Sequence, residues 1–424
     1  MIKEPVIPVF DLIRSLSEAM DVAVPALVDH HNQVAYIALS LGAELALPLE
    51  QRKELVVAGM LHDIGAFYLK ERLQVLQFEA DNLRKHAEIG YSLLKGFQPF
   101  SSVAEIVRFH HMYWDKGKGS EFKGEPVPLG SHILHLADRV AVLLNKEQEV
   151  LGQVESISER IEEQSGKMFM PQLVDALKSL ATKEYFWLDT ASQSIGSVLR
   201  RRVRLEAIEL GAEELLSLAN LFRRIIDFRS PFTATHSSGV AASAEALARL
   251  AGFSERECRM MKVAGYLHDL GKLAVPAEIL EKPAKLTGDE FNLIRSHTFY
   301  TYRILEPIAD LEVINTWGSF HHERLDASGY PFHLKGEDLS LGSRIMAVAD
   351  VFTAITEDRP YRQGMTSERA LQVLKQMVDN SALDSKVVSL LSLHFEEINS
   401  FRIVAQAAAS KEYQVFDRRS NTVR

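Results

Sequence analysis

Apolar residues recur along most of the chain at spacings of three and four, the periodicity of amphipathic α-helices. Residues 55–62 and 261–268 each place small and apolar side chains on one helical face that ends in a histidine. Ser254 and Thr287 are each followed three residues later by a glutamate, the spacing of a capping box, and predict helix starts. Alternating runs typical of strands are scarce. The pattern predicts an all-α protein.

The same unit occurs twice along the chain. His and Asp positions of the first half recur in the second at an offset of 206 residues that grows in small steps to 212. The matched pairs are His30 with His236, His62-Asp63 with His268-Asp269, His86 with His297, His110-His111 with His321-His322, and Asp138 with Asp350. This order predicts two tandem helical bundles that arose by duplication. We place the first domain at residues 1–195, a helical linker at 196–214, and the second domain at 215–424.

Composition and charge narrow the class of protein. The formal net charge of −9 argues against a DNA- or RNA-binding protein, which needs a basic field. The single cysteine, Cys258, excludes an intramolecular disulfide and suits a reducing compartment. No apolar run is long enough for a membrane span, and no secretory signal is visible, so we expect a cytoplasmic protein with no membrane contact. Apolar residues between Ile208 and Leu221 suit a linker helix that supports a homodimer.

The second unit carries the residues expected to do chemistry. Taken singly, each histidine is more often a packed core residue than a ligand, but the whole set recurs at matched spacing. Five imidazoles and two carboxylates are too many for one structural zinc site, and the mixed set suits iron or manganese. Two divalent ions bridged by a carboxylate would clamp a phosphoryl oxygen and lower the pKa of a bridging water. The candidate ligands are His236, His268, Asp269, His297, His321, His322 and Asp350. The set predicts a phosphohydrolase.

These motifs resemble one known family. The stretch from His268-Asp269 to Lys272, then His297, His321-His322, Gly329-Tyr330-Pro331, Asp350, Arg359 and Arg362, is similar to the HD-GYP family. That family belongs to the HD superfamily of phosphohydrolases and typically hydrolyses cyclic di-GMP. The resemblance covers about residues 215–397.

The resemblance implies a role for each matched residue. Asp269 would bridge two metal ions, and Lys272 would approach the scissile phosphate, so these two residues would be catalytic. His236, His268 and Asp350 would surround one ion. His297, His321 and His322 would surround the other. Tyr330, Arg359 and Arg362 would contact the nucleotide.

Three positions depart from the family pattern. Ala327 and Thr301 stand where the family usually has glycine, so we expect altered loop geometry with the ligands intact. Phe232 stands where some members carry a glutamate for a third metal, which favours a two-metal site.

The first unit resembles an HD domain without the family's distinguishing parts. It keeps a full potential ligand set, His30, His62, Asp63, His86, His110, His111 and Asp138, and so predicts a second metal site. Ala66 stands where the lysine would be, and residues 114–119 replace the Gly-Tyr-Pro loop. We therefore interpret the first domain as regulatory, or as a metal domain of different specificity, rather than as a second copy of the same activity, although the retained ligands keep that option open.

Three functions remain open from the sequence. The leading hypothesis is hydrolysis of cyclic di-GMP to the linear 5′-phosphorylated dinucleotide. A rival within enzymes is hydrolysis of a mixed cyclic dinucleotide, cyclic GMP-AMP, because nothing in the motifs reads the bases. The third is a non-catalytic cyclic-dinucleotide receptor that docks other signalling proteins. Replacing Asp269 by alanine separates enzyme from receptor, since only an enzyme loses turnover.

Overall fold

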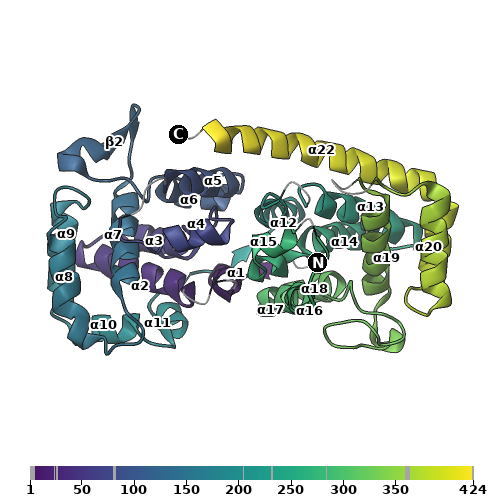
Figure 1. Cartoon of the computed structure of the whole chain (residues 1–424), viewed down its shortest axis with the longest axis horizontal. Coiled ribbons are helices and arrows are strands. Elements are labelled where there is room, and N and C mark those ends of the chain that lie inside the picture. The colour runs from purple at the N-terminus through teal and green to yellow at the C-terminus, as the bar shows by residue number, and fades with distance from the viewer. Residues whose placement is uncertain are drawn as a thin grey trace. The chain divides into compact units, whose positions relative to one another are not determined.

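The computed structural model describes residues 5–22, 24, 27–79, 83–203, 205–230, 233–282, 284–358 and 363–422. Within these ranges the regular secondary structure is almost entirely helical (Figure 1), which confirms the predicted all-α class. Strands are confined there to two short antiparallel ribbons, one of β1 (Val6–Ile7) with β4 (Ile208–Glu209) and one of β2 (Glu121–Phe122) with β3 (Glu125–Pro126). The chain divides into two compact units, residues 8–207 with 419–424, and residues 1–7 with 208–418.

The N-terminal unit is built around one buried helix. This helix, α2 (His30–Glu44), is buried from residue 30 to 42 and packs against α3 (Leu49–Leu61) and α7 (Leu129–Leu143). The other helices of the unit are α1 (Val9–Val22), α4 (Leu69–Gln74), α5 (Arg84–Leu94), α6 (Ser101–Arg108), α8 (Val154–Glu162), α9 (Pro171–Ala181), α10 (Glu184–Thr190) and α11 (Ile195–Arg202).

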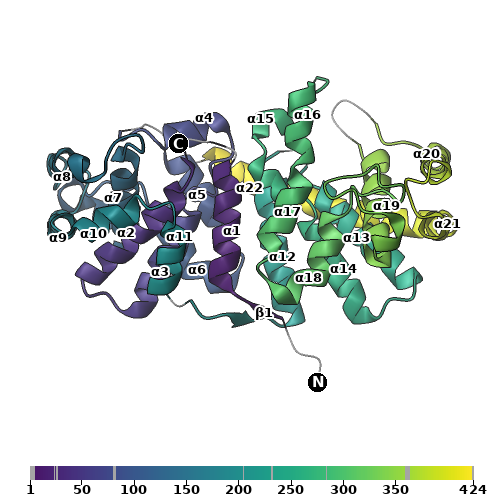
Figure 2. The same cartoon turned by 90° about the horizontal axis from the view of Figure 1, so that it is seen from below.

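The C-terminal unit repeats this arrangement. Its central helix, α13 (His236–Leu250), packs against α14 (Glu255–Leu267) and α19 (Leu341–Thr356). Figure 2 shows α18 between α17 and α14 in this unit. The remaining helices are α12 (Ala212–Asp227), α15 (Ala277–Leu280), α16 (Gly288–Arg295), α17 (His297–Leu305), α18 (Glu312–Ser319), α20 (Ser367–Asp379), α21 (Ser385–Leu393) and α22 (Phe395–Thr422).

Each unit contains a close helix crossing at a glycine, and this crossing explains why the glycine is present in both repeats. A Cβ atom on Gly59 of α3 would lie 2.6 Å from the Cα of Ala35, and one on Gly265 of α14 would lie 2.5 Å from the Cα of Ala241. Any side chain at either glycine would push the paired helices apart. Because each glycine lies three residues before the His-Asp motif, this contact fixes the end of the helix that carries the motif.

Two local predictions can be compared with the structure. The capping boxes at Ser254 and Thr287 are present and begin α14 and α16. The predicted helical linker over 196–214 is not one helix, because α11 ends at Arg202 and the strand β4 precedes α12.

The apolar face proposed for a homodimer is buried inside the C-terminal unit. Leu215, Leu218 and Leu221 of α12 are at most 8% exposed, since α12 packs against α14. This corrects the expectation that these residues form a free surface. Among the described residues no helix is both long and apolar enough to cross a membrane.

Candidate metal centres

Helix ends converge on one point in the C-terminal unit. His236 and His297 are the first residues of α13 and α17, and Asp350 lies within α19. His268-Asp269 stands between the end of α14 and a short 3-10 turn at Leu270–Ala274, and His321-His322 follows α18. All seven predicted ligands therefore come together, and six of them are buried, with His322 partly exposed.

The seven side chains form two groups that meet at Asp269. Nε2 of His236 lies 3.2 Å from Oδ1 of Asp350, and these two residues cluster with His268. The second cluster holds His297, His321 and His322, with 3.3 Å between Nε2 of His297 and Nε2 of His321. In each cluster the potential ligand atoms lie within 4.8 Å of one another, as a single metal ion would require.

Asp269 directs one oxygen to each group. Its Oδ2 lies 3.2 Å from Nε2 of His268, and its Oδ1 lies 3.3 Å from Nε2 of His297. A carboxylate in this position can bridge two ions. Nε2 of His268 is buried and has no hydrogen-bond partner. Such an orphaned acceptor among carboxylates fits a cation, so the residues present suit a metal centre.

Backbone carbonyls fix how the imidazoles face the centre. Nδ1 of His268 donates to the carbonyl oxygen of Gly265 at 2.8 Å, and Nδ1 of His321 donates to that of Gly318 at 2.7 Å. His297 makes the same contact with Ile294 at 2.6 Å. Each bond leaves Nε2 free to bind a metal and sets the tautomer.

A carboxylate that the sequence analysis missed orients the remaining histidine. Nδ1 of His236 lies 3.1 Å from Oε1 of Glu357, and the amide of Gln406 on α22 donates to Oε2 of Glu357 at 2.9 Å. Glu357 stands seven residues after Asp350, two helical turns along the same face, and this spacing was the available signal. No sequence signal pointed to Gln406, because only folding brings α22 to this site.

Burial and charge set the protonation of the metal-free centre. Burial lowers the pKa of His297 to about 4 and that of His322 to about 3, so both are neutral at pH 7 and keep the lone pairs that bind metals. Burial also opposes a charged His236, but Glu357 and Asp350 outweigh it and raise the pKa to about 10. Burial would raise the pKa of Asp269, yet His268 and Lys272 hold it well below its usual value. The centre thus collects negative charge on its carboxylates.

The residues expected to meet substrate lie beside this centre where they are described. Nζ of Lys272 is 2.5 Å from Oδ2 of Asp269. The ring of Tyr330 lies 4.9 Å from that of His322, and the guanidinium of Arg295 lies 4.8 Å from the Tyr330 ring. Arg295 was not predicted. Arg359, Arg362 and Phe232 lie outside the described residues.

Both described departures from the family pattern have visible consequences. Ala327 adopts φ of 63°, the left-handed conformation that favours glycine. The hydroxyl of Thr301 accepts from the backbone N–H of Gly271 at 2.8 Å and donates to the carbonyl of His268 at 3.0 Å. Thr301 therefore ties α17 to the turn that carries Asp269, a contact that a glycine lacks.

A second missed carboxylate shapes the Gly-Tyr-Pro loop. Glu323 is 1% exposed and accepts hydrogen bonds from the backbone N–H groups of Phe332 at 2.7 Å and Leu334 at 3.0 Å. A buried carboxylate with two such donors holds the loop in one conformation.

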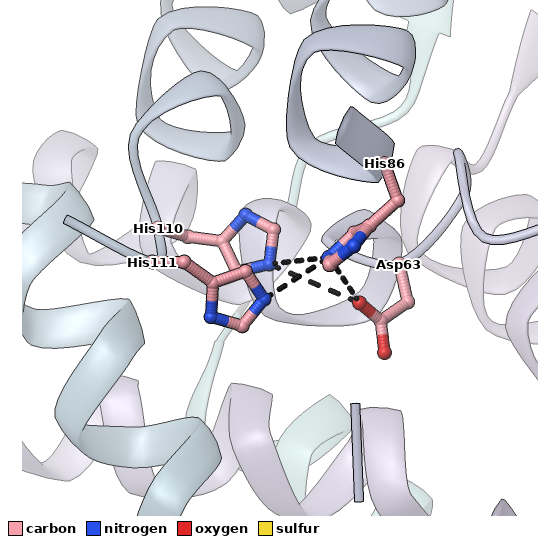
Figure 3. Close-up of side chains that lie close together, drawn as sticks. All are labelled: Asp63, His86, His110 and His111. Atoms are coloured by element: carbon pink, nitrogen blue, oxygen red, sulfur yellow. Dashed lines mark hydrogen bonds and ion pairs between the residues drawn. The ribbon is translucent and has the colours of Figure 1, made fainter. Parts of the chain in front are cut away.

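The N-terminal unit brings together its own seven predicted residues, all of them buried. Nε2 of His30 lies 3.3 Å from Oδ1 of Asp138, and Nε2 of His62 lies 3.3 Å from Oδ2 of Asp63. His30, His62 and Asp63 form one cluster, and Asp63, His86, His110 and His111 form another (Figure 3). Both oxygens of Asp63 are buried without a hydrogen bond, as is Nε2 of His62, so this set also fits a cation. Burial lowers the pKa of His110 to about 4, which keeps it neutral.

Comparison with known proteins gives two HD domain matches, at residues 27–143 and 220–387. The chain is 31% identical over 376 residues to 3′3′-cGAMP-specific phosphodiesterase 1 of Vibrio cholerae, covering 86% of each chain. It is 27% identical to 3′3′-cGAMP-specific phosphodiesterase 3 of the same organism, covering 91% of this chain and 94% of that one.

Two further matches complete the comparison. A cyclic di-GMP phosphodiesterase response regulator of Xanthomonas campestris is 38% identical over 178 residues, 42% of this chain and 47% of that one. A crystal structure of a cyclic GMP-AMP-specific phosphodiesterase from Vibrio cholerae is 23% identical, with a TM-score of 0.62 over 92% of this chain and 98% of that chain. That structure shares the fold.

Proposed function

The chain belongs to the HD-GYP family, with a second HD domain before the HD-GYP domain, and is a cyclic-dinucleotide phosphodiesterase; we propose that its preferred substrate is 3′3′-cyclic GMP-AMP. The observation that carries the chemistry is the C-terminal centre, in which Asp269 faces both histidine clusters and Lys272 at once.

The reaction we propose is hydrolysis of one phosphodiester bond. Two divalent ions, iron or manganese by the mixed imidazole and carboxylate set, would supply Lewis-acid charge and a nucleophile at neutral pH. His236, His268 and Asp350 would hold one ion, His297, His321 and His322 the other, and Asp269 both. Water adds to phosphorus, the bond from phosphorus to the 3′ oxygen breaks, and that oxygen leaves as a hydroxyl. The product is a linear dinucleotide with a 5′ phosphate.

Protein groups beside the centre position the phosphate. Lys272 presents a fixed ammonium group at the bridging carboxylate, where a phosphoryl oxygen gains negative charge in the transition state. Tyr330, packed between His322 and Arg295, offers an aromatic face at the edge of the centre. A nucleobase can stack on such a face whichever base it is, so this contact supports a dinucleotide without selecting one.

The extent of the similarities supports the mixed substrate. The two relatives matched over most of the chain, including the N-terminal unit, both carry the name of 3′3′-cGAMP-specific phosphodiesterases. The cyclic di-GMP phosphodiesterase from Xanthomonas campestris matches less than half of the chain. The difference in coverage favours cyclic GMP-AMP over cyclic di-GMP as the substrate. Cyclic di-GMP stays the second candidate because of the match to the Xanthomonas campestris protein.

Competition between substrates tests the proposal. The full chain, reconstituted anaerobically with iron or manganese, is assayed with 3′3′-cyclic GMP-AMP, cyclic di-GMP and cyclic di-AMP, and products are separated by chromatography. We expect kcat/KM to be highest for the mixed dinucleotide and turnover to vanish in Asp269→Ala. A higher kcat/KM for cyclic di-GMP would overturn the substrate assignment. A chain that binds metal yet hydrolyses none of the three would overturn the enzymatic one.

A further inference from the structure

The N-terminal centre differs from the C-terminal one in what surrounds it. We propose that it is a closed metal site, which holds one zinc-type divalent ion through Asp63, His86, His110 and His111 and takes no substrate. Its role is to stabilise the N-terminal unit.

The four side chains make a complete cage (Figure 3). Nε2 of His86 lies 3.0 Å from Nε2 of His111, 3.3 Å from Nε2 of His110 and 3.2 Å from Oδ1 of Asp63. Ligands at zinc distances in a tetrahedron lie about 3.3 Å from one another. All four potential ligand atoms fall within 4.8 Å of one another. Four protein ligands fill a tetrahedral zinc site, as in structural zinc sites.

A histidine of α7 covers this cage. His135 is 2% exposed, and its ring lies 5.8 Å from that of His111. Tyr113 stacks on His135 with 5.6 Å between ring centroids, and Phe169 packs against it at 5.4 Å. His135 therefore lies between His111 and two further aromatic rings.

A buried arginine closes the other side. Arg139 is 1% exposed, and its Nη2 donates to Oδ2 of Asp138 at 2.5 Å and to the carbonyl of Val75 at 2.6 Å. It also donates to the carbonyl of Gln77. The guanidinium thus occupies one oxygen of Asp138 and places a permanent positive charge beside it. That charge disfavours a second cation between His30 and Asp138, which is why we infer a single ion.

Backbone hydrogen bonds hold the loop at residues 114–119 in place. The N–H groups of Trp114 and Asp115 donate to the carbonyls of Met168 at 3.2 Å and Lys167 at 2.8 Å. The loop that replaces Gly-Tyr-Pro is therefore fixed to the segment that carries Phe169.

The C-terminal unit lacks this cover at the matching positions. Ala347 and Val351 occupy the places of His135 and Arg139, three residues before and one after the aspartate. The side chain of His322 remains 25% exposed there. Two residues of one helix thus distinguish a closed centre from an open one.

Metal retention tests the proposal independently of turnover. The full chain and its Asp269→Ala variant are loaded with zinc, treated with a chelator, and their metal content is measured over time. We expect about one ion per chain to resist the chelator in both proteins, because four buried ligands hold it. That ion should be absent from Asp269→Ala/Asp63→Asn. Cobalt in place of zinc should give the intense visible absorption of a four-coordinate site.

Opening the site is the sharper test. His135→Ala/Arg139→Val gives α7 the residues of α19, and we expect the retained ion to leave about 10- to 100-fold faster. Far-UV circular dichroism verifies that the variant is folded. If the variant does not fold, the metal-retention measurement on the wild-type chain still tests the proposal.

Three results would overturn the proposal. One is a wild-type chain with no chelator-resistant ion, and another is a chelator-resistant ion that survives Asp63→Asn. The third is phosphodiester hydrolysis by Asp269→Ala that disappears when Asp63 is also replaced, because a closed site cannot admit substrate.

Discussion

The two units carry the same seven potential ligands on matching elements, yet they present them to different surroundings. In the C-terminal unit the side chain of Asp350 is 10% exposed and Lys272 reaches the bridging carboxylate. In the N-terminal unit Asp138 is 1% exposed and Ala66 stands in place of the lysine. The ligand pattern therefore predicts a metal centre, while access and nearby cations decide whether that centre can do chemistry.

The largest expected contrast is between the two bridging carboxylates. Asp269→Ala removes the group that faces both clusters, so we expect kcat/KM for cyclic-dinucleotide hydrolysis to fall by at least about a thousandfold. Asp63→Ala should leave turnover unchanged while it lowers the melting temperature, because its centre is closed. Chromatographic assays and thermal unfolding of both variants measure the contrast. An equal loss of turnover in Asp269→Ala and Asp63→Ala would contradict the expected contrast.

The second contrast concerns the lysine. Lys272→Ala should lower kcat by about 100-fold with metal content unchanged, because a preorganised charge beside the phosphoryl oxygen is lost. Lys262→Ala is the control, since Lys262 lies on the neighbouring helix α14 and pairs with Glu245. Steady-state kinetics and metal analysis of the two variants provide the measurement. A loss of bound metal in Lys272→Ala would show that the lysine acts on the ligands instead.

A smaller effect is expected at the carboxylate that orients His236. Glu357→Gln keeps the size of the side chain but removes its charge, and we expect metal affinity at the C-terminal centre to drop about tenfold. The N-terminal unit has Asn145, a shorter uncharged amide, at the matching position. Metal titrations followed by activity are the measurement. Excess metal should restore turnover, and failure to restore it would contradict this role.

The smallest effect concerns pH and stability. Asp227 contacts Ser237 at 2.7 Å, whereas its N-terminal counterpart Asp21 contacts His31. Burial raises the pKa of Asp227 to about 6, although Arg223 opposes this. The folded metal-free chain therefore binds this proton more tightly than the unfolded chain, and its free energy of unfolding falls as pH rises from about 4 to 6.

Removing the carboxylate should remove that dependence. In Asp227→Asn the fall of roughly 2 kcal/mol between pH 4 and 6 should disappear. Chemical denaturation of the metal-free chain at pH 4, 5 and 6 measures it, with wild type alongside. An unchanged slope in the variant would assign the dependence to other groups.

The fold and the ligand sets were largely predictable, and particular residues show why. Helical periodicity and the repeated His-Asp motif are local signals, and most of the seven candidate ligands of each unit stand at or next to helix ends. Glu323 and Arg295 were missed because charged residues are common and their spacing is not diagnostic. Glu357 was missed although it stands seven residues after Asp350. The predicted dimer surface was wrong for a related reason: an apolar stripe predicts burial, but not against which helix.

Ligand type and order along the chain are enough to predict an all-α duplication with two potential metal centres. The proposed difference between an open and a closed centre depends on tertiary packing. The contacts that matter join residues far apart in sequence, His135 with Tyr113 and Arg139 with Val75. In the sequence these residues look like ordinary core and surface positions. Whether a side chain covers an ion or leaves it accessible depends on distances of a few ångströms between helices, and those distances are set only when the core packs.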